Sequence, residues 1–347
     1  MRAAVFEAPE KIVVQDVPDP VCPDGGIVIK VHACGICGSD VRNYHTGLKD
    51  GIERQIMGHE FTGTVAEVGR GVTRFRVGDP VAAAPDVSCG ECYYCRRGFV
   101  NLCDNHRMLG THWPGGFAEY VGIESVVMQH GMIHRVPDGL SLDDAALSEP
   151  ASSVIASQID ANVSMGDTVL IIGDGPIGCL QIQIARARGA SRVIIAGKHR
   201  LSIVPRFSPD LIIDGASEDI AKVVRDYTGG LGADVAICAN RRASSQQPAV
   251  DAVRKRGKVV LFGGVSRHEP MTTLNSNTIH YNEITVMGSF SYRAYMHEEA
   301  LRAIADGRIT APAYVTRTVS LNGITHGFEA AEAGDALKVL VKPEDRI

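Results

Sequence analysis

The sequence lacks any long hydrophobic run. No segment approaches the roughly 18 consecutive apolar residues of a membrane-spanning helix, and the start, MRAAVFEAPEK, has no basic region followed by an apolar one as in a secretory signal. The chain also lacks an excess of basic residues, with 35 lysines and arginines against 40 aspartates and glutamates. We therefore expect neither membrane nor nucleic acid as partner, but a small-molecule substrate.

Internal repeats and low-complexity segments are absent as well, which leaves an ordinary globular protein. The 347 residues suffice for roughly two domains. Nine cysteines, four of them between residues 89 and 103, do not resemble the framework of a small disulfide-rich protein. Metal-bound thiolates in a reducing cytoplasm fit this pattern better.

The hydrophobic pattern changes near residue 157. Before it, short β-type runs such as IVIKVHA and TGTVAEV alternate with turns rich in glycine and proline, which predicts a β-rich domain. After it, strands alternate with helices, which predicts an α/β fold with a parallel sheet. The expected strands are 167–173, 192–196, 211–214, 234–239 and 258–264, and the expected helices are 176–190, 200–207, 218–229 and 244–257.

The sharpest motif is CGECYYCRRGFVNLC, in which Cys89, Cys92, Cys95 and Cys103 follow the pattern CxxCxxCx7C. Four thiolates at this spacing can surround one tetrahedral zinc ion, as in closed structural sites. Bacterial ferredoxins also contain CxxCxxC, but their fourth cysteine precedes a proline, whereas Asp104 follows Cys103. The spacing therefore favours zinc over an iron–sulfur cluster.

A second group of motifs, CGICGSD and GHE, offers mixed ligands. Cys37, His59 and Glu60 supply one thiolate, one imidazole and one carboxylate, a set suited to a catalytic zinc with a position open for substrate. Cysteines and histidines are also buried without a metal, and Cys34 is expected only to pack in the core.

The third motif, IIGDGPIG, contains the pattern GxGxxG at Gly173, Gly175 and Gly178. It follows an apolar strand and precedes a helix, which predicts a turn that binds the pyrophosphate of a dinucleotide at the helix N-terminus. Asp174, between the first two glycines, would oppose that negative charge unless its side chain points away.

Together these residues resemble the zinc-containing medium-chain dehydrogenase/reductase family, and within it the sorbitol (polyol) dehydrogenase branch. The resemblance covers almost the whole chain, because CGICGSD, GHEFTG, the four-cysteine motif, GGFAEY, LSEP, GDGPIG and LFGG occur in the family's order and at its distances. It implies a GroES-like catalytic domain at 1–156 and 293–347, with a structural zinc lobe at 86–106, and a Rossmann domain at 157–292. A homodimer or homotetramer, paired through the strand at 284–292, is also implied.

By the same resemblance, the cysteine, histidine and glutamate of the mixed group hold a catalytic zinc. Glu149 is then either a further ligand or an acidic neighbour without a metal bond. Ser39 would pass the substrate's proton onward or cap a helix, and His45 would extend this relay or face solvent. The zinc would acidify a bound alcohol, whose hydride goes to a nicotinamide cofactor. The cofactor residues implied are Gly173, Gly175, Pro176, Ile177, Gly178, Gly263 and Gly264.

The second strand of the predicted Rossmann domain ends unusually, in VIIAGKHR. An NAD-binding fold has an acidic residue about 20 residues after the glycine motif, but Gly197 stands there. Without that carboxylate a 2′-phosphate is not repelled, and Lys198, His199 and Arg200 supply positive charge. Arg242, further along the chain, can reach the same corner. We therefore expect NADP(H) rather than NAD(H), with a solvated basic turn as the alternative.

Departures from the polyol branch bear on the substrate. Ser291 stands where those enzymes have an arginine that holds substrate hydroxyls, although Arg293 is close by, and Asn43 replaces a tyrosine. Phe117 either faces the substrate or belongs to the core. A polyol, cyclitol or sugar-derived secondary alcohol is expected. The alternatives are oxidation of a β-hydroxy acid, as by threonine dehydrogenases, and non-catalytic NADPH binding, against which the intact zinc ligands argue.

Overall fold

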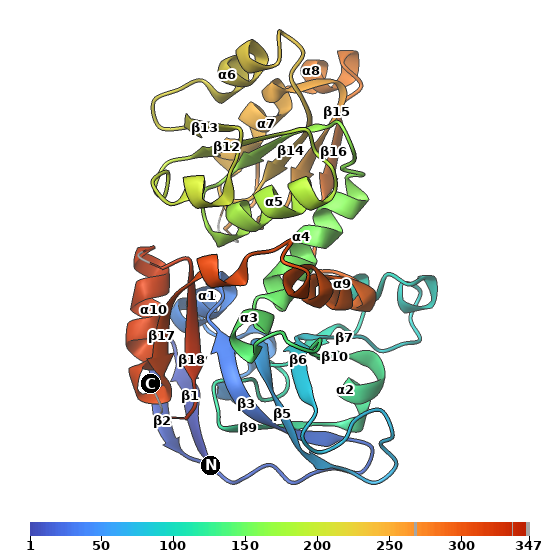
Figure 1. Ribbon diagram of the computed structural model, residues 1–347, viewed down its shortest axis with the longest axis vertical. Helices are drawn as coiled ribbons and strands as arrows, with labels where there is room; N and C mark the ends of the chain where they lie inside the picture. Colours follow the sequence, from blue (N-terminus) through green and yellow to red (C-terminus); the bar gives the residue numbers. More distant parts are fainter. Residues whose placement is uncertain (267–268, 335, 345–347) are drawn as a thin grey trace. The chain divides into compact units, whose positions relative to one another are not determined.

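The computed structural model describes residues 1–266, 269–334 and 336–344. The chain divides into two compact units, one formed by Met1–Ser152 with Tyr292–Ile347 and the other by Ser153–Ser291. The first unit is rich in β-strands and the second alternates strands with helices (Figure 1). Across the described ranges, no helix combines the length and the apolar character needed to cross a membrane.

The first unit is built on a seven-stranded mixed sheet. Its strand order is β10-β6-β5-β3-β18-β17, with β9 also paired to β3. These strands are β3 (Ile27–Gly35), β5 (Glu60–Val68), β6 (Pro80–Ala84), β9 (Tyr120–Ile123), β10 (Met132–Arg135), β17 (Val315–Ser320) and β18 (Lys338–Lys342). Since β18 runs antiparallel to β3, with Val341 opposite Cys34, the C-terminal segment completes a sheet begun by the N-terminal one.

Smaller elements surround this sheet. A three-stranded sheet has the order β2-β1-β4, and a two-stranded sheet pairs β7 with β8. Their bounds are β1 (Arg2–Ala8), β2 (Lys11–Asp16), β4 (Gln55–Ile56), β7 (Asp86–Val87) and β8 (Arg107–Met108). The helices of this unit are α1 (Gly38–Thr46), α2 (Ser125–His130), α3 (Leu142–Ala145), α9 (Ala294–Ala305) and α10 (Ile324–Ala333), with 3-10 turns η1 (Lys49–Gly51), η2 (Cys95–Arg97), η3 (Val100–Leu102), η6 (Ala311–Ala313) and η7 (Leu321–Gly323). A further helix, α4 (Ser148–Asp160), begins in this unit and continues into the second.

The core of this unit follows the two-residue period of its strands. Along β3, Ile29 and Val31 are buried, whereas Lys30 and His32, which alternate with them, are exposed. Phe117 is fully buried in the same core, and its ring packs edge-on against Phe328 with centroids 6.0 Å apart. Of the two interpretations of Phe117, the structure therefore supports a core residue.

The second unit is a doubly wound α/β domain, as predicted. Six parallel strands lie in the order β13-β12-β11-β14-β15-β16, which is that of a Rossmann fold. The strands are β11 (Thr168–Ile172), β12 (Arg192–Gly197), β13 (Leu211–Asp214), β14 (Ala233–Cys238), β15 (Val253–Leu261) and β16 (Thr285–Gly288). The connecting helices are α5 (Pro176–Ala187), α6 (Ile220–Tyr227), α7 (Gln246–Ala252) and α8 (Ser276–Tyr281), with turns η4 (Val204–Phe207) and η5 (Ala243–Ser245).

Helices cover both faces of this parallel sheet (Figure 1). On one face, Ile194 of β12 packs in a cluster with Val224 of α6 and Val250 of α7. On the other face, α5 lies so close that a Cβ atom on its Gly178 would be 3.5 Å from Ile195 Cδ1. Because both faces are covered, the strands are continuous apolar runs, as the sequence of β11 already indicated.

Two of the predicted helices are wrong in extent. The helix expected at 244–257 ends at Ala252, since the buried Val253 pairs with β14 and begins β15. Arg256, with φ 59°, could not belong to an α-helix. The segment 200–207 forms only a 3-10 turn over Val204–Phe207, where Pro205 lacks the N–H that a helix continuing from Arg200 would use.

The third glycine of GDGPIG gives a test of this packing. A Cβ atom on Gly178 would lie 1.8 Å from the backbone oxygen of Gly173, so Gly178→Ala should lower the free energy of unfolding by about 1–3 kcal/mol. Gly323→Ala, where the nearest atom to the new methyl group is Val319 Cβ at 3.5 Å, is the control and should change it by less than about 0.5 kcal/mol. Urea unfolding followed by circular dichroism measures both, and equal effects would contradict the packing.

Candidate functional site

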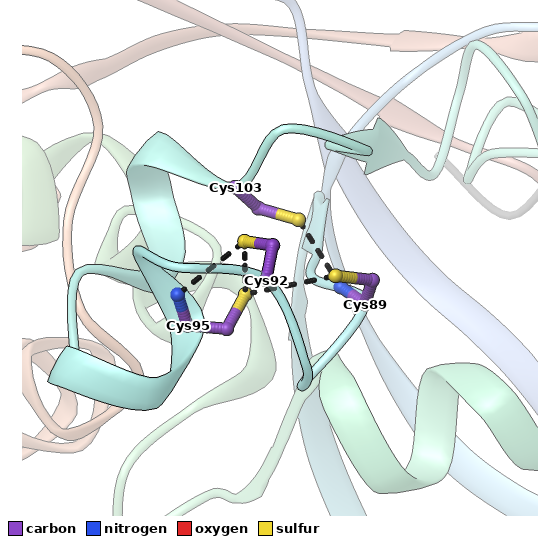
Figure 2. Close-up of side chains that lie close together, drawn as sticks. All are labelled: Cys89, Cys92, Cys95 and Cys103. Atoms are coloured by element: carbon purple, nitrogen blue, oxygen red, sulfur yellow. Dashed lines mark hydrogen bonds between the residues drawn. The ribbon is translucent and has the colours of Figure 1, made fainter.

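Four cysteines converge in the segment between β7 and β8. The turns η2 and η3 bend this segment so that the sulfur atoms of Cys89, Cys92, Cys95 and Cys103 all lie within 4.8 Å of one another (Figure 2). Backbone N–H groups point inward as well, since Cys89 N lies 3.2 Å from Cys103 Sγ and Cys95 N lies 3.5 Å from Cys92 Sγ.

The spacing of these sulfur atoms fits a metal and not a disulfide. Cys92 Sγ lies 3.4 Å from Cys95 Sγ, and Cys89 Sγ lies 4.0 Å from Cys95 Sγ. A disulfide needs about 2.05 Å, whereas zinc bonds of about 2.3 Å put two sulfur atoms of a tetrahedron about 3.8 Å apart. Backbone N–H groups, that of Cys95 first, lower the pKa of the Cys92 thiol to about 6, which favours a thiolate. The donor set can therefore hold zinc.

A second cluster forms where β3 and β5 meet. The antiparallel register places Gly35 opposite Glu60, so Cys37, directly after β3, comes beside His59 and Glu60 at the start of β5. One ligand atom from each of these three residues lies within 4.8 Å of the others. The mixed group predicted from the sequence is thus assembled by strand pairing, and its thiolate, imidazole and carboxylate suit zinc.

Glycine makes room for this cluster. A Cβ atom on Gly35 would lie 2.1 Å from Glu60 Oε2, so a larger residue would displace the carboxylate. Gly58, with φ +89°, likewise leaves space for Cys34 Sγ, which would be 2.7 Å from its Cβ. Cys34 is fully buried and packs in the core, as expected.

Asp40 orients the cluster, a role that sequence reasoning missed. Its carboxylate accepts a hydrogen bond from the Cys37 N–H at 2.9 Å, and its other oxygen lies 3.2 Å from His59 Nδ1. Burial alone would lower the pKa of His59, but the neighbouring Asp40 carboxylate outweighs burial and raises it. With Nδ1 directed at Asp40, Nε2 is the nitrogen left for a metal. The signal in the sequence was the carboxylate three residues after Cys37.

Lys338 is a second residue that the sequence did not reveal. Its ammonium lies 2.8 and 2.6 Å from the two carboxylate oxygens of Glu60 and 3.4 Å from the carbonyl of Ile36. Both side chains are buried. Burial alone would lower the pKa of Lys338, but Glu60 raises it, so the ammonium of Lys338 stays protonated. Glu60 therefore serves an ion pair and a candidate metal site together.

Glu149 does not share a ligand-atom cluster with the other three residues in the described part of the chain. It lies in the first turn of α4, where the hydroxyl of Tyr292 donates a hydrogen bond of 2.7 Å to Oε1. Loss of solvation raises the pKa of Glu149 to about 7, and the negative charge of Glu60 adds to the rise. Near neutral pH the carboxyl group of Glu149 is therefore present in both its protonated and its ionised form.

The residues of the expected proton relay lie apart from one another. Ser39, on α1, has its hydroxyl 3.4 Å from His59 Nε2. His45, at the last turn of α1, is partly exposed, with Nδ1 3.3 Å from Glu10 and Nε2 3.1 Å from Glu332. Ser39 is therefore a neighbour of the cluster, whereas His45 belongs to a surface group of charges.

The second unit has a pocket at the carboxyl ends of β11, β12 and β14. The strand order reverses between β11 and β14, which is where Rossmann folds bind ligands. The lining includes five of the predicted cofactor residues, Gly173, Gly197, Lys198, His199 and Arg242, together with Asn240 and Ser245, which were not predicted. Predicted residues outside the described lining are Gly175, Pro176, Ile177, Gly178, Arg200, Gly263 and Gly264.

Glycines also shape the turns around the pocket, both in its lining and outside it. Gly173 has φ +133°, and its N–H donates to the carbonyl of Ala196. Gly175 caps α5, with Pro176 in the first turn. A Cβ atom on Gly263 would lie 2.0 Å from the carbonyl oxygen of Asn240. The carboxylate of Asp174 is directed at the loop after β12, where it accepts the N–H groups of Lys198 and His199.

Comparison with known proteins identifies the family of the chain. The family model described as "Alcohol dehydrogenase GroES-like domain" matches residues 23–138, and the one described as "Zinc-binding dehydrogenase" matches residues 176–306. D-arabitol-phosphate dehydrogenase of Enterococcus avium is 33% identical, over 99% of each chain. A sorbitol dehydrogenase of Halalkalibacterium halodurans is also 33% identical, over 96% of each chain.

Solved structures share the fold over nearly the whole chain. A protein of Sinorhizobium meliloti described as a zinc-binding dehydrogenase and bound to NADP has a TM-score of 0.90 and 30% identity, over 99% of both chains. A protein of Escherichia coli described as a short chain alcohol dehydrogenase and complexed with NADH has a TM-score of 0.89 and 26% identity, over 99% of both chains.

The fold and the family matches thus define a zinc-dependent oxidoreductase that acts on alcohols with a nicotinamide cofactor. The chain belongs to the zinc-containing medium-chain dehydrogenase/reductase family, in its polyol dehydrogenase branch. The prediction of family and enzyme class from the sequence is confirmed.

The buried ion pair at the mixed cluster can be tested by substitution. Lys338→Met should lower the free energy of unfolding by about 3–5 kcal/mol, because it leaves the Glu60 carboxylate buried and unpaired. Lys342→Met, on the same strand, removes a half-exposed pair with Asp143 and should cost about 0–1 kcal/mol. Urea titration of the zinc-depleted proteins makes the comparison. A loss no larger than that of the control would contradict the structural role of Lys338.

Proposed function

We propose that the protein is an NADP(H)-dependent dehydrogenase of polyols or related secondary alcohols, with two zinc ions per chain. The observation that carries this proposal is the convergence of Cys37, His59 and Glu60, beside a carboxyl that is not part of that cluster. A site with three protein ligands leaves a position open for a substrate oxygen, whereas the four-cysteine cluster is closed and structural.

In the proposed mechanism, Cys37 and His59 hold the catalytic zinc, with Glu60 as third ligand. When bound, zinc supplies a Lewis acid that lowers the pKa of an alcohol or polarises a ketone. Asp40 keeps the His59 ring in place and fixes which nitrogen carries the proton. Lys338 balances part of the negative charge gathered by the thiolate and the carboxylate.

Ser39 and Glu149 handle the proton and the substrate in this proposal. The Ser39 hydroxyl, 3.4 Å from His59 Nε2, lies where it can accept a proton from an alcohol and pass it toward solvent. Glu149 can bind as a further, exchangeable ligand or hold a substrate hydroxyl, since Tyr292 fixes one of its oxygens. The pKa of Glu149 near 7 allows either protonation state at neutral pH.

The proposed preference for NADP(H) rests on the lining of the Rossmann pocket. Gly197 brings no carboxylate to the end of β12, and Lys198, His199 and Arg242 line the pocket with groups that can bind a phosphate. An NAD-specific fold would instead present an acidic side chain to the ribose. Both cofactors occur among the solved relatives, so the preference is argued from these residues alone.

The polyol class is favoured over β-hydroxy acids by the relatives named above, which act on D-arabitol phosphate and sorbitol by their names. A homodimer or homotetramer in the cytoplasm completes the proposal. The oligomer is supported by β16, a terminal strand of the Rossmann sheet, because no strand in the described part of the chain pairs with its outer edge, where a second chain can add.

Metal analysis tests the assignment of the two clusters. The purified protein should contain two zinc ions per chain, and Cys37→Ser should lower this to one and reduce turnover by about 100-fold or more, because the Lewis acid contributes several kcal/mol to the transition state. Cys103→Ser should also remove one zinc but mainly lower the melting temperature. Atomic absorption with steady-state kinetics decides. Full turnover by Cys37→Ser would refute the catalytic cluster.

Kinetics with both cofactors test the proposed specificity. Polyols, cyclitols, sugar-alcohol phosphates and L-threonine are assayed with NAD and NADP in parallel, and a polyol-type substrate with NADP should give the highest kcat/KM. Lys198→Ala should raise the KM for NADP by about 10-fold, as expected for one charged hydrogen bond, and leave that for NAD unchanged. Lys222→Ala, an exposed lysine of α6 paired with Asp226, is the control. Higher efficiency with NAD would overturn the preference.

A further inference from the structure

Asp174, between the first two glycines of GDGPIG, is buried at the edge of the Rossmann pocket. One of its oxygens, Oδ2, accepts hydrogen bonds from three successive backbone N–H groups, those of Lys198 at 2.9 Å, His199 at 2.7 Å and Arg200 at 2.6 Å. Successive N–H groups that converge on one point form an anion-binding nest. Here the anion in the nest belongs to the protein itself.

The electrostatics of this nest keep the carboxylate charged. Burial alone would raise the pKa of Asp174, but the N–H groups of Arg200, His199 and Lys198 outweigh burial and lower it. The negative charge is therefore permanent at neutral pH, and the partners that satisfy it are the N–H groups of the loop after β12.

Asp174 also explains the glycine at the end of β12. A Cβ atom on Gly197 would lie 2.3 Å from Asp174 Cβ, 2.4 Å from Cγ and 2.5 Å from Oδ2. Gly197 is not among the residues with positive φ, so lack of space, and not backbone conformation, requires glycine here. A carboxylate at 197 and one at 174 therefore exclude each other.

The filled nest determines how a cofactor can be recognised. Because the three N–H groups are already bound, they are not available to a 2′-phosphate, and recognition must come from side chains. Lys198, His199 and Arg242 line the pocket, and Arg200 Nη1 lies 3.9 Å from the Cβ position of Gly175. Lys198, His199 and Arg200 all belong to the loop whose three N–H groups are bound by Asp174.

We propose that Asp174 is a positioning residue that selects the cofactor. It occupies the space that a side chain at 197 would need, so that no ribose-binding carboxylate can stand there, and it holds the loop Lys198–Arg200 in the conformation that receives a 2′-phosphate. This inference rests on the proposed NADP(H) preference and gives it a structural cause. Asp174 and Gly197 then act as one unit, so cofactor choice cannot be reversed at 197 alone.

The test compares three variants: Gly197→Asp, Asp174→Gly and the exchange of both. Binding of adenosine 2′,5′-bisphosphate and of 5′-AMP is measured by calorimetry on the zinc-loaded protein, with the melting temperature recorded without nucleotide. Gly197→Asp alone should bind both probes more weakly and melt earlier, because the two side chains collide. Asp174→Gly should weaken the bisphosphate more than 5′-AMP. The exchange should regain the melting temperature lost by Gly197→Asp and shift the ratio of affinities toward 5′-AMP by about 10- to 100-fold.

Asp210→Asn is the matched control, because Asp210 accepts the Val193 N–H at the opposite end of β12. It should leave the ratio of affinities unchanged. The inference is overturned if Gly197→Asp alone gives the full shift at an unchanged melting temperature. It is also overturned if Asp174→Gly weakens 5′-AMP more than the bisphosphate, since Asp174 would then contact the ribose itself.

The proposed NADP(H) preference can fail separately. That preference is tested by calorimetry on the wild-type protein, which should bind adenosine 2′,5′-bisphosphate more tightly than 5′-AMP. If it does not, the cofactor proposal is wrong, and the melting temperatures of the single and exchanged variants, recorded without nucleotide, still decide whether positions 174 and 197 act as a unit. Additive losses there refute the unit whichever cofactor is preferred.

Discussion

The ion pair between Glu60 and Lys338 is the interaction on which the β-rich unit and its metal cluster depend together. The two residues are 278 positions apart and begin neighbouring parts of one sheet, β5 and β18. A buried ion pair contributes little net stability when intact, because desolvation offsets the Coulomb attraction. Its importance lies in the alternative, since either charge left alone in this interior would be strongly unfavourable. The pair therefore ties correct closure of the sheet by the C-terminal segment to correct placement of Glu60 in the candidate metal cluster.

Other buried carboxylates in the molecule follow the same rule with different partners. Asp40 is satisfied by the backbone N–H of Cys37 and by the His59 ring. Asp174 is satisfied by three N–H groups of one loop. In each case a charge that could not remain unpaired fixes the backbone on which a functional side chain sits. The stability of the fold and the geometry of the sites are thus not separate properties in this protein.

Sequence patterns predicted the architecture and the four-cysteine cluster because those signals are local. Cys37, His59 and Glu60 come from two separate motifs that strand pairing brings together, and they were assigned to one zinc through the family resemblance. CxxC spacing, GxGxxG and alternating strands and helices each depend on residues close together in the chain. Lys338, Tyr292 and Asn240 could not be found in this way, since tertiary contacts bring them to the sites from distant segments that carry no motif. The start of β15 was missed for a related reason: pairing with β14 overrode a local pattern that resembled a helix.

A glycine leaves space for a buried carboxylate both at the mixed cluster and at the Rossmann pocket. This changes the interpretation of the basic turn after β12. Gly35 leaves space for Glu60, whose Oε2 would be 2.1 Å from a Cβ atom there, and Gly197 leaves space for Asp174, whose Oδ2 would be at 2.5 Å. Each glycine ends a strand and admits a carboxylate from another segment. From the sequence, Gly197 looked like the loss of an acidic residue. In the structure a carboxylate from another segment, that of Asp174, fills the space beside Gly197 and accepts the N–H groups of Lys198, His199 and Arg200. Under the proposed function, recognition of the cofactor is then left to the side chains of that loop.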